Sequence, residues 1–580
     1  MAELKRLWRF IKPYKSKFLV GLCCLLVCDV LQLLVPRIFK SILEALEKGE
    51  LSTNSLLKQC AAIIGIAATI AIFRWFWRHN ILATSRQVER DVRRAYFKHL
   101  LTLPSAYFDQ AKIGDLMARA TNDVTAVQRL CGPGIFASFD GIVLCTFALA
   151  FMLRLDPWLT LVAIIPLPLI TIKILILGRR IHKRAQESQE AFAALSQAVQ
   201  ENMAGVRVVK DFNQEEYQND YFQQISKKYV DKNLGLVKYM SLTHPVLLFI
   251  IQISFALALL YGGQAVMVGR ISLGALVAFL AYLEILIWPA IAIGWVVNLI
   301  QRGLASLGRI GTVLDTVPEI KDGTGVAEEK TNGLALEMKA VTFSYGKELK
   351  PSLKNVSFSL PWGGTLGVVG LTGSGKTTIA RLLLREYEAE EGTVFVNGYS
   401  VRQYELDKLR QFFGLVPQDT FLFSGPIEEN ICFGADDKLA APDIAAADAG
   451  ILDEINSLPH QMSTVIGERG VTLSGGQKQR LAIARALYLN RPIVILDDCL
   501  SAVDTETEEK ILRNLKKHMQ ERTALVVSNR ISSVKHADEI IVLKEGEIIE
   551  RGTHAELLSL DGLYADLHRR QQIEEWIESH

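Results

Sequence analysis

A run of nine residues in the C-terminal half has the composition of a loop that binds phosphate groups. Glycines let backbone amides point inward at a phosphate, and the helix expected to follow adds a positive dipole at its N-terminus. The loop follows the apolar run 365–369, which is expected to form a strand. Its lysine suits the β- and γ-phosphates, and the threonine after it suits Mg²⁺. The predicted nucleotide-binding residues are Gly370, Leu371, Thr372, Gly373, Ser374, Gly375, Lys376, Thr377 and Thr378.

A second apolar run, 493–496, ends in Asp497, whose carboxylate is predicted to hold the same Mg²⁺ as Thr377. Between the two strands, two successive glycines stand at the start of an expected helix, which makes another anion site. One nucleotide does not need two such sites from one domain, so this one is predicted to serve a nucleotide bound elsewhere. Its residues are Leu473, Ser474, Gly475, Gly476 and Gln477.

The elements that must carry these residues divide the chain of 580 residues into two parts. Every long apolar stretch lies before about residue 300, and the remainder has the pattern of an α/β protein. A bilayer core of about 30 Å is crossed by about 20 apolar residues in a helix. Six segments meet this requirement: 18–35, 60–77, 135–155, 158–178, 246–268 and 273–300.

The distribution of lysine and arginine predicts the orientation. Both are frequent in the leader before residue 18 and in the connections after the second and fourth segments, which places both termini in the cytoplasm. The two long connections, 78–132 and 179–244, are expected to be helical stalks with tips near 114–118 and 205–212. A net charge of only +2 gives no basic field for nucleic acid.

Four charged residues lie inside apolar segments, where burial of a charge costs on the order of 3 kcal/mol. Such residues usually face a bundle interior or an aqueous cavity. At least one of Asp140 and Glu284 is therefore expected to line a substrate path. Lys173 is expected to extend toward the membrane surface, and Asp29 to lie near that interface.

The order of phosphate loop, glutamine, LSGGQ and strand-end aspartate resembles the ATP-binding cassette proteins. With six preceding segments, the chain resembles a type I exporter half-transporter of the multidrug and lipid-export type. The resemblance implies an all-α six-helix transmembrane domain over residues 1–320, followed by an α/β P-loop NTPase cassette over 330–580. It also implies ATPase activity with ATP and Mg²⁺, contact with membrane lipid, and an amphipathic small-molecule substrate such as a drug or a lipid.

The same resemblance assigns roles by position. Tyr345 is expected to stack on adenine, which a flat aromatic face favours. Gln418 resembles the glutamine that senses Mg²⁺ and the membrane domain, and Asp504 belongs to a segment, 501–504, resembling the D-loop. In this family two cassettes dimerise head to tail, so each nucleotide lies between one phosphate loop and the opposite LSGGQ. Segments 467–470, 108–123 and 201–212 resemble its cross-linking loop and two intracellular loops.

The expected catalytic residues are Asp498, Asn529 and Gln418. The first two depart from the family pattern. Asp498 stands where glutamate usually polarises the attacking water, and Asn529 stands where a histidine is usual. General base catalysis is worth about 10²–10⁴-fold, so hydrolysis at this site is expected to be slow. We therefore predict a heterodimer in the bacterial plasma membrane, in which a second half-transporter carries the intact glutamate and histidine.

Two alternatives remain open on the sequence. One is a homodimeric exporter with slow hydrolysis, and the other is an ATP-binding regulator or gated channel of the same architecture. An importer is disfavoured because membrane and motor parts are fused in the exporter order. A soluble cassette ATPase is disfavoured by the six apolar segments.

Overall fold

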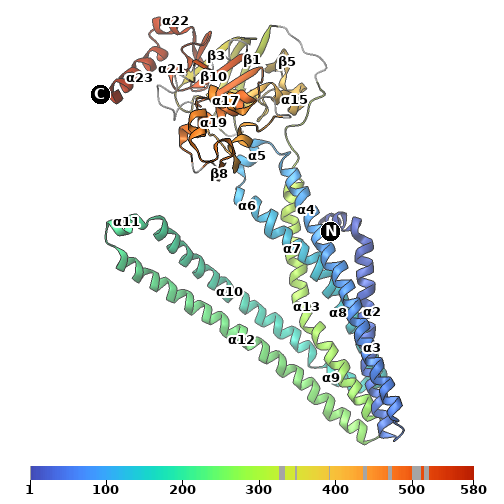
Figure 1. The fold of residues 1–580 in the computed structure, drawn as a ribbon. Helices are drawn as coiled ribbons and strands as arrows, with labels where there is room; N and C mark the ends of the chain where they lie inside the picture. The colour runs from blue at the N-terminus through green and yellow to red at the C-terminus, as the bar shows by residue number, and fades with distance from the viewer. Residues whose placement is uncertain are drawn as a thin grey trace. The chain divides into compact units, whose positions relative to one another are not determined.

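The computed structural model describes residues 2–325, 333–346, 349–390, 392–435, 441–467, 470, 473–499, 511, 513–514 and 522–579. They form two compact units (Figure 1). The helical unit contains Met1–Leu101 and Ile113–Thr316, and the α/β unit contains Thr102–Lys112 and Val317–His580. Each unit has its own core.

The helical unit consists of long helices joined by short turns. Among the described residues, five helical segments are long and apolar enough to cross a membrane, and they coincide with five of the six predicted segments. The helix at the third segment has the predicted bounds. The helices are α1 Ala2–Ile11, α2 Lys15–Glu47, α3 Thr53–Arg78, α4 Thr84–Leu100, α6 Ile113–Ala118, α7 Val124–Arg129, α8 Ile135–Leu155, α9 Pro157–Ile164, α10 Leu167–Ala204, α11 Val206–Asp211, α12 Glu215–Met267 and α13 Leu273–Leu314.

The fourth predicted segment, 158–178, is not one continuous helix. It divides into α9 and the first part of α10, with a turn at Ile165 and Pro166. Pro166 and Pro168 have no backbone N–H to donate, so the hydrogen-bond ladder of a helix cannot run through this point unbroken. The prediction missed the break because the run is apolar throughout.

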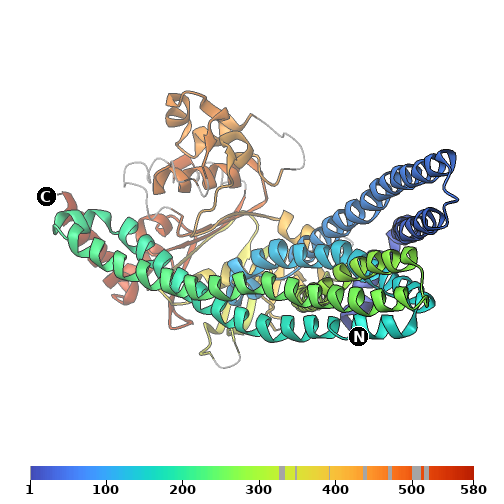
Figure 2. The same cartoon turned by 90° about the horizontal axis from the view of Figure 1, so that it is seen from below.

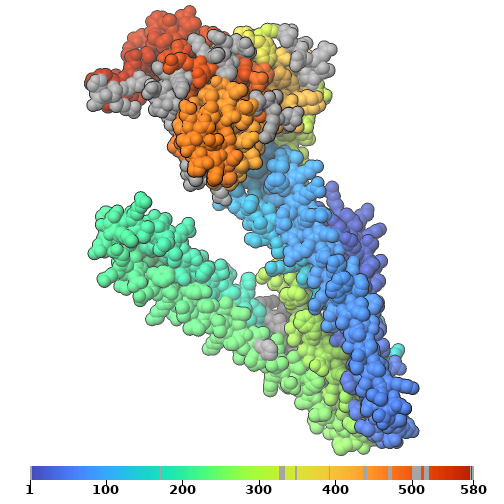
Figure 3. All heavy atoms as spheres, viewed as in Figure 1, coloured from blue at the N-terminus to red at the C-terminus, as the bar shows by residue number. Residues whose placement is uncertain are grey.

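Helices α10 and α12 lie side by side as a long antiparallel hairpin closed by α11 (Figures 1 and 2). Toward its α11 end the hairpin separates from the rest of the helical unit (Figure 3). These helices extend far beyond the length of a membrane span, which confirms the predicted helical stalk. Its tip is α11, within the predicted range 205–212.

The α/β unit is built on a sheet of six strands in the order β12-β11-β3-β10-β9-β6. All neighbours are parallel except β11 and β12. A second, antiparallel sheet has the order β2-β1-β4-β5. The strands are β1 Leu334–Phe343, β2 Leu353–Pro361, β3 Thr365–Gly370, β4 Val394–Val396, β5 Tyr399–Ser400, β6 Phe413–Val416, β7 Gly425–Pro426, β8 Val465–Ile466, β9 Ile493–Asp497, β10 Thr523–Ser528, β11 Glu539–Lys544 and β12 Glu547–Gly552.

Helices pack on one face of the parallel sheet, and the antiparallel sheet and short helices pack on the other, so its strands are buried on both sides. Successive residues of β9 alternate between two cores: Ile493 and Ile495 belong to one, and Val494 and Leu496 to the other. The described helices of this unit are α5 Ser105–Gln110, α14 Lys376–Leu383, α15 Leu406–Gln411, α16 Ile427–Ile431, α17 Pro442–Asp448, α18 Leu452–Ser457, α19 Gly475–Tyr488, α21 Ile531–Val534, α22 His554–Ser559 and α23 Leu563–Ser579.

One short helix from the N-terminal half belongs to the α/β unit. Ala106 of α5 packs against the core of this unit, and the hydroxyl of Tyr387 donates a hydrogen bond to Asp109. The sequence placed the tip of the first stalk at 114–118, but those residues form most of α6 in the helical unit. The residues grouped with the α/β unit are Thr102–Lys112, which precede the predicted range.

Candidate nucleotide-binding site

The predicted site residues meet at the carboxyl edge of the parallel sheet. Four adjacent strands, β3, β10, β9 and β6, lead into the phosphate loop, Asn529, Asp498 and Gln418, respectively. Carboxyl ends of parallel strands share one edge, so these segments converge although they are far apart in sequence. They surround a cavity of about 270 Å³, lined by Tyr345, Ser352, Thr372, Gly373, Gly375, Lys376, Thr377, Thr378, Gln418, Asp497, Asp498 and Asn529.

The loop between β3 and α14 requires glycine at two positions. Gly375 has φ +101°, and a Cβ atom there would lie 2.3 Å from the carbonyl oxygen of Ser352. A Cβ atom on Gly370 would lie 2.2 Å from the carbonyl oxygen of Leu543. At both positions the backbone is therefore packed too closely for a side chain.

Lys376 is held inside the loop that precedes it. Its Nζ donates hydrogen bonds to the carbonyl oxygens of Gly370 at 2.8 Å and Leu371 at 3.0 Å. Burial lowers the pKa of this ammonium group, while Asp498 and Asp497 oppose that shift. Ser374 is buried, and its hydroxyl has no hydrogen-bond partner among the described residues. A buried cation and an unpaired hydroxyl group fit a phosphate ligand.

Two oxygen-bearing side chains that line the cavity contact each other. The hydroxyl of Thr377 donates to Oδ1 of Asp497 at 3.1 Å. Burial raises the pKa of Asp497, and the hydrogen bond from Thr377 counteracts that shift. Hydroxyl and carboxylate oxygens are the ligands that Mg²⁺ prefers, so this pair fits a magnesium ion.

The two residues that depart from the family pattern contact each other. The amide Nδ2 of Asn529 donates to Oδ2 of Asp498 at 3.2 Å, and the backbone N–H of Asn529 approaches Oδ1 at 3.4 Å. Asp498 has φ +48°, a left-handed conformation that aspartate tolerates better than most residues. An amide can orient this carboxylate, but it cannot accept a proton as a histidine can.

Tyr345 lines the same cavity, and three neighbouring side chains surround it. Its hydroxyl lies 3.0 Å from that of Thr378, and its ring centre lies 4.9 Å from that of Tyr387 in an edge-on arrangement. The Arg381 guanidinium lies 5.9 Å from the ring centre. The ring is thus fixed at the rim of the cavity, as stacking on a flat base requires.

The residues 473–477 do not line this cavity. The hydroxyl of Ser474 accepts a hydrogen bond from the backbone N–H of Gln477 at 3.2 Å, and Oε1 of Gln477 accepts one from the backbone N–H of Ser474 at 2.8 Å. This reciprocal pair caps α19 and leaves its glycines at the helix start. Two of the predicted features lie outside the described residues: Asp504 with its segment 501–504, and the middle of the segment 467–470.

A residue that the sequence did not indicate supports this second anion site. Glu454 of α18 accepts a hydrogen bond from Nε2 of Gln477 at 2.8 Å and forms an ion pair with Arg480 at 2.7 Å. Glu454 has no motif around it and is 23 residues away from Gln477. A contact of this kind depends on the packing of α18 against α19, and no local pattern could have revealed it.

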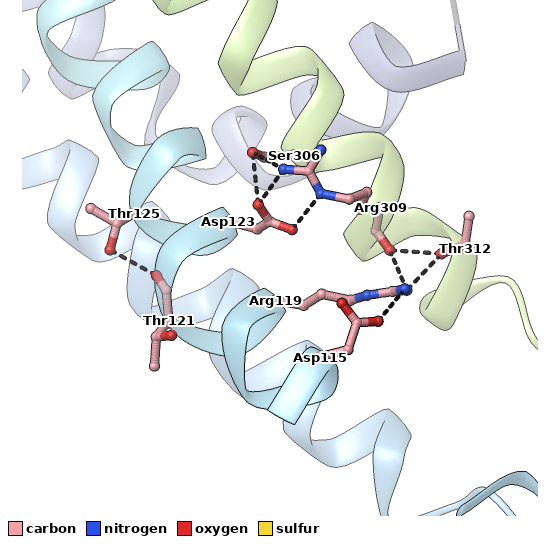
Figure 4. Close-up of polar contacts among 8 residues, drawn as sticks. All are labelled: Asp115, Arg119, Thr121, Asp123, Thr125, Ser306, Arg309 and Thr312. Carbon is pink, nitrogen blue, oxygen red and sulfur yellow. Dashed lines mark hydrogen bonds and ion pairs between the residues drawn. The ribbon is translucent and has the colours of Figure 1, made fainter. Parts of the chain in front are cut away.

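In the helical unit, the segment that resembles the first intracellular loop is tied to α13 (Figure 4). Arg309 binds the carboxylate of Asp123 through two nitrogens, one of them Nε at 2.9 Å, and Ser306 donates to the same carboxylate at 2.9 Å. Arg119 donates to the hydroxyl of Thr312 at 3.0 Å. The two bonds of Arg309 make a bidentate, orientation-specific contact between the segments.

The acids predicted to line a substrate path do come together. Asp140 and Glu284 line one cavity of about 640 Å³ in the helical unit. Asp29 lines the same cavity and is buried in the helical unit. Its side chain interacts with that of Asp140, a contact between α2 and α8 that the sequence cannot show. Lys173 is exposed on α10 and does not line this cavity.

Comparisons with known proteins agree with this architecture. Residues 18–290 match the family model described as ABC transporter transmembrane region, and residues 353–501 match the one described as ABC transporter. A solved structure, described as that of a bacterial Atm1-family ABC exporter with ATP bound, superposes with a TM-score of 0.78 at 26% identity. The match covers 96% of this chain and 98% of that chain.

Curated relatives match over nearly the whole length. The probable multidrug resistance ABC transporter ATP-binding/permease protein YheI of Bacillus subtilis is 37% identical over 99% of this chain and 98% of its own length. The ATP-dependent lipid A-core flippase of Vibrio cholerae is 33% identical over 98% of this chain and 97% of its own length. With a helical membrane region followed by an ATP-binding ATPase cassette, this integral membrane protein belongs to the ABC transporter family and has the exporter fold.

Proposed function

We propose that this chain is one subunit of a dimeric ATP-driven exporter in a bacterial plasma membrane, with both termini in the cytoplasm. Residues 1–320 form its membrane domain, and residues 330–580 form its cassette. The bacterial relatives support the location, and the distribution of lysine and arginine supports the orientation. Relatives named for multidrug resistance and for lipid A-core flipping support an amphipathic small molecule as the exported substrate.

The cavity at the carboxyl edge of the sheet is the proposed ATP site. Lys376 and the loop amides bind the β- and γ-phosphates, Tyr345 stacks on adenine, and Thr377, Asp497 and Gln418 hold Mg²⁺. When bound, ATP supplies the phosphoanhydride bond whose hydrolysis drives the cycle. Asp498 orients the attacking water, and Asn529 in turn orients Asp498. The unpaired hydroxyl of Ser374 and the close-packed glycines support the phosphate position.

The second anion site is proposed to complete the ATP site of another subunit. Its residues cap α19 and lie away from the cavity around Lys376, which supports a role toward a nucleotide held by a different cassette. In a head-to-tail dimer, Ser474 and the glycines after it donate to the γ-phosphate held by the partner subunit. Binding of ATP then favours the closed dimer, because the nucleotide has a higher affinity for that state.

The partner is proposed to be a different half-transporter. The contact of Asn529 with Asp498 carries this proposal: the carboxylate is one methylene shorter than glutamate, and its neighbour cannot carry a proton. Both changes weaken the same step, the activation of water at the γ-phosphate. A homodimer would hydrolyse ATP slowly at both of its sites, whereas a mixed dimer would hydrolyse ATP rapidly at the intact site of the partner.

The test is steady-state ATPase activity of the purified chain, alone and co-purified with a half-transporter that carries glutamate and histidine at the positions of Asp498 and Asn529. We expect at least about tenfold more turnover in the mixed dimer. Ser474→Ala in this chain should abolish most of that gain, since Ser474 would act on the partner's nucleotide. Turnover by this chain alone equal to that of the mixed dimer would support the homodimeric exporter instead.

A further inference from the structure

The short segment between β10 and α21 carries Asn529, whose side chain bonds Asp498. It begins after Ser528, the last residue of β10, and ends at Ile531, the first residue of α21. The first backbone N–H groups of a helix have no partner within that helix. The side chain of Arg530, which precedes α21, makes no capping bond to it. The start of α21 is therefore open to a partner from elsewhere in the cassette.

A single side chain from the C-terminal helix binds this backbone twice. Nε2 of Gln571 in α23 donates a hydrogen bond to the carbonyl oxygen of Asn529 at 2.7 Å. Oε1 of the same amide accepts one from the backbone N–H of Ile531 at 2.8 Å. A glutamine amide carries its acceptor and its donors at fixed positions, so both bonds form together only for one orientation of the segment. Gln571 thus sets the position and the direction of the backbone at Asn529.

Helix α23 is itself fixed to the core of the α/β unit. Near its start, Glu550 of β12 accepts a hydrogen bond from the backbone N–H of Tyr564 at 3.0 Å. Tyr564 and Leu567 belong to the same hydrophobic core as Ile531. Gln571 follows these two residues of α23 at the spacing of one helix face. The helix therefore brings Gln571 to the segment from a buried anchor.

The side-chain amide of Asn529 depends on this backbone for its direction. Its Nδ2 donates to Asp498 at 3.2 Å, whereas its Oδ1 is buried and has no hydrogen-bond partner among the described residues. A displacement of the backbone at Asn529 would therefore move the amide away from the carboxylate. Catalysis is sensitive to such shifts, since a misplacement of about 1 Å can cost about 100-fold in rate.

A simpler account would give Gln571 only the task of capping α21. The bond from Ile531 fits that account, because it satisfies a backbone donor at the helix start. The bond to Asn529 does not, because a helix start has unpaired donors and this partner is an acceptor outside the helix. The second bond therefore indicates that Gln571 holds Asn529 as well as the helix.

We propose that Gln571 is a positioning residue for ATP hydrolysis, which fixes Asn529 against Asp498 from the C-terminal helix. Gln571 does not line the cavity around Lys376, so it acts through Asn529 and not on the nucleotide. This inference rests on the role proposed above for Asn529 at the ATP site. The rate of hydrolysis then depends on α23 as well as on the residues that contact the nucleotide.

Hydrogen–deuterium exchange of the full chain in nanodiscs without nucleotide tests the contact itself. Gln571→Ala should accelerate exchange at the backbone amide of Ile531 by about fivefold or more, because that N–H loses its acceptor. Gln572→Ala is the matched control, because it changes the exposed neighbour on the same helix. The control should leave exchange at Ile531 unchanged. Equal exchange rates in the two variants would overturn the proposal.

The kinetics of ATP hydrolysis by the purified chain separate positioning from capping. Gln571→Ala should lower kcat at least about threefold and change KM for ATP by less than about twofold, because the residues that bind ATP are untouched. Gln571→Glu keeps the acceptor for Ile531, and with it the cap of α21, but has no donor for Asn529 when ionised. It should therefore also lower kcat, with a thermal midpoint close to that of the natural chain. An unchanged kcat in Gln571→Glu would leave capping as the whole role and overturn the proposal.

A double variant shows whether Gln571 acts through Asn529. Asn529→Ala should lower kcat, and addition of Gln571→Ala should lower it no further. A further fall would show a separate route and overturn the proposal. If Asn529→Ala left kcat unchanged, the role proposed for Asn529 at the ATP site would be wrong, and the inference would fall with it. If Asn529→Ala lowered kcat and neither variant of Gln571 did, the inference alone would be wrong.

Discussion

The side-chain amide of Asn529 donates a hydrogen bond of 3.2 Å to the carboxylate of Asp498. The two residues follow adjacent parallel strands, β10 and β9, which brings them together at the edge of the sheet. In the proposed site each stands where the family pattern has a different residue, and together they form one contact. The two departures therefore act as a unit, and neither is expected to have its full effect alone.

Restoring both residues should restore hydrolysis. We expect the variant D498E/N529H to raise the ATPase rate of the purified chain by about tenfold or more, because glutamate reaches the water and histidine can carry a proton. For each single variant, the increase in the logarithm of the ATPase rate should be less than half of that for the double variant. The reason is that each single variant leaves the other residue of the pair unchanged. Initial rates of phosphate release measure this. Lys376→Ala in the same background serves as the control and should abolish the activity; an unchanged rate in the double variant would argue against a catalytic role for the pair.

The glycine at the start of α14 should be irreplaceable for a specific steric reason. Gly373 and Gly375 both have positive φ, at +82° and +101°, but only a Cβ on Gly375 meets backbone, at 2.3 Å from the Ser352 oxygen. We expect Gly373→Ala to cost about 1–2 kcal/mol of stability from backbone strain. Gly375→Ala should cost clearly more and also lower the affinity for ATP. Thermal unfolding with and without ATP measures both; equal destabilisation by the two variants would contradict this account.

The contact between Asp123 and Arg309 should contribute to the stability of the helical unit. Asp123 is buried, whereas the Arg309 side chain is about half exposed, so solvent screening reduces the contribution. We expect Asp123→Ala or Arg309→Ala to cost about 1–2 kcal/mol, with a coupling energy of about 1 kcal/mol in the double variant. Thr125→Val is the control, because the Thr125 hydroxyl donates to the carbonyl oxygen of Thr121 in the preceding turn and not to α13. Additive effects of the two substitutions, measured by denaturation in detergent, would show that the pair does not interact.

Asp497 should reduce the stability of the nucleotide-free protein. Burial raises its pKa above the ordinary value of 3.8, so between 3.8 and the native pKa the folded state holds more protons than the unfolded state. The protonated carboxyl group therefore favours the folded state at low pH, and this stabilisation is lost as the pH rises through that window. We expect Asp497→Asn to raise the thermal midpoint at neutral pH without nucleotide, and to flatten the dependence on pH above 3.8. Mg²⁺ with ATP should stabilise the natural protein more than the variant. A lower midpoint for the variant at every pH would contradict this.

The convergence of the proposed nucleotide-site residues could be predicted because they lie in short motifs with strict backbone requirements. Gly370 through Thr378 combine glycines and a lysine between an expected strand and an expected helix, the context in which this motif is recognised. The convergence of Gln418, Asp497 and Asn529 also follows, since each comes after a buried parallel strand. The hydrogen bond between Asn529 and Asp498 could not be predicted, because it depends on which strands are neighbours and on their register.

Features that arise from tertiary packing could not be predicted from the sequence. Glu454 supports the start of α19 from a separate helix, and Asp29 and Asp140, from α2 and α8, meet at one cavity. The break at Pro166 was missed because hydropathy alone does not register a missing backbone donor. The short helix α5 was not predicted, because amphipathic patterns of short helices are weak signals.

Strand β10 lies between β3 and β9, although the chain produces it after both. During translation, a nascent chain that ends before residue 523 has the phosphate loop and Asp497 but lacks the strand that joins their two halves of the sheet. Almost the whole chain, through the end of β10 at Ser528, must therefore be synthesised before Lys376 and Asp497 can face one ligand. Until then the exposed edges of β3 and β9 are open to wrong pairing, which makes this stretch of synthesis the period when the cassette most needs a chaperone.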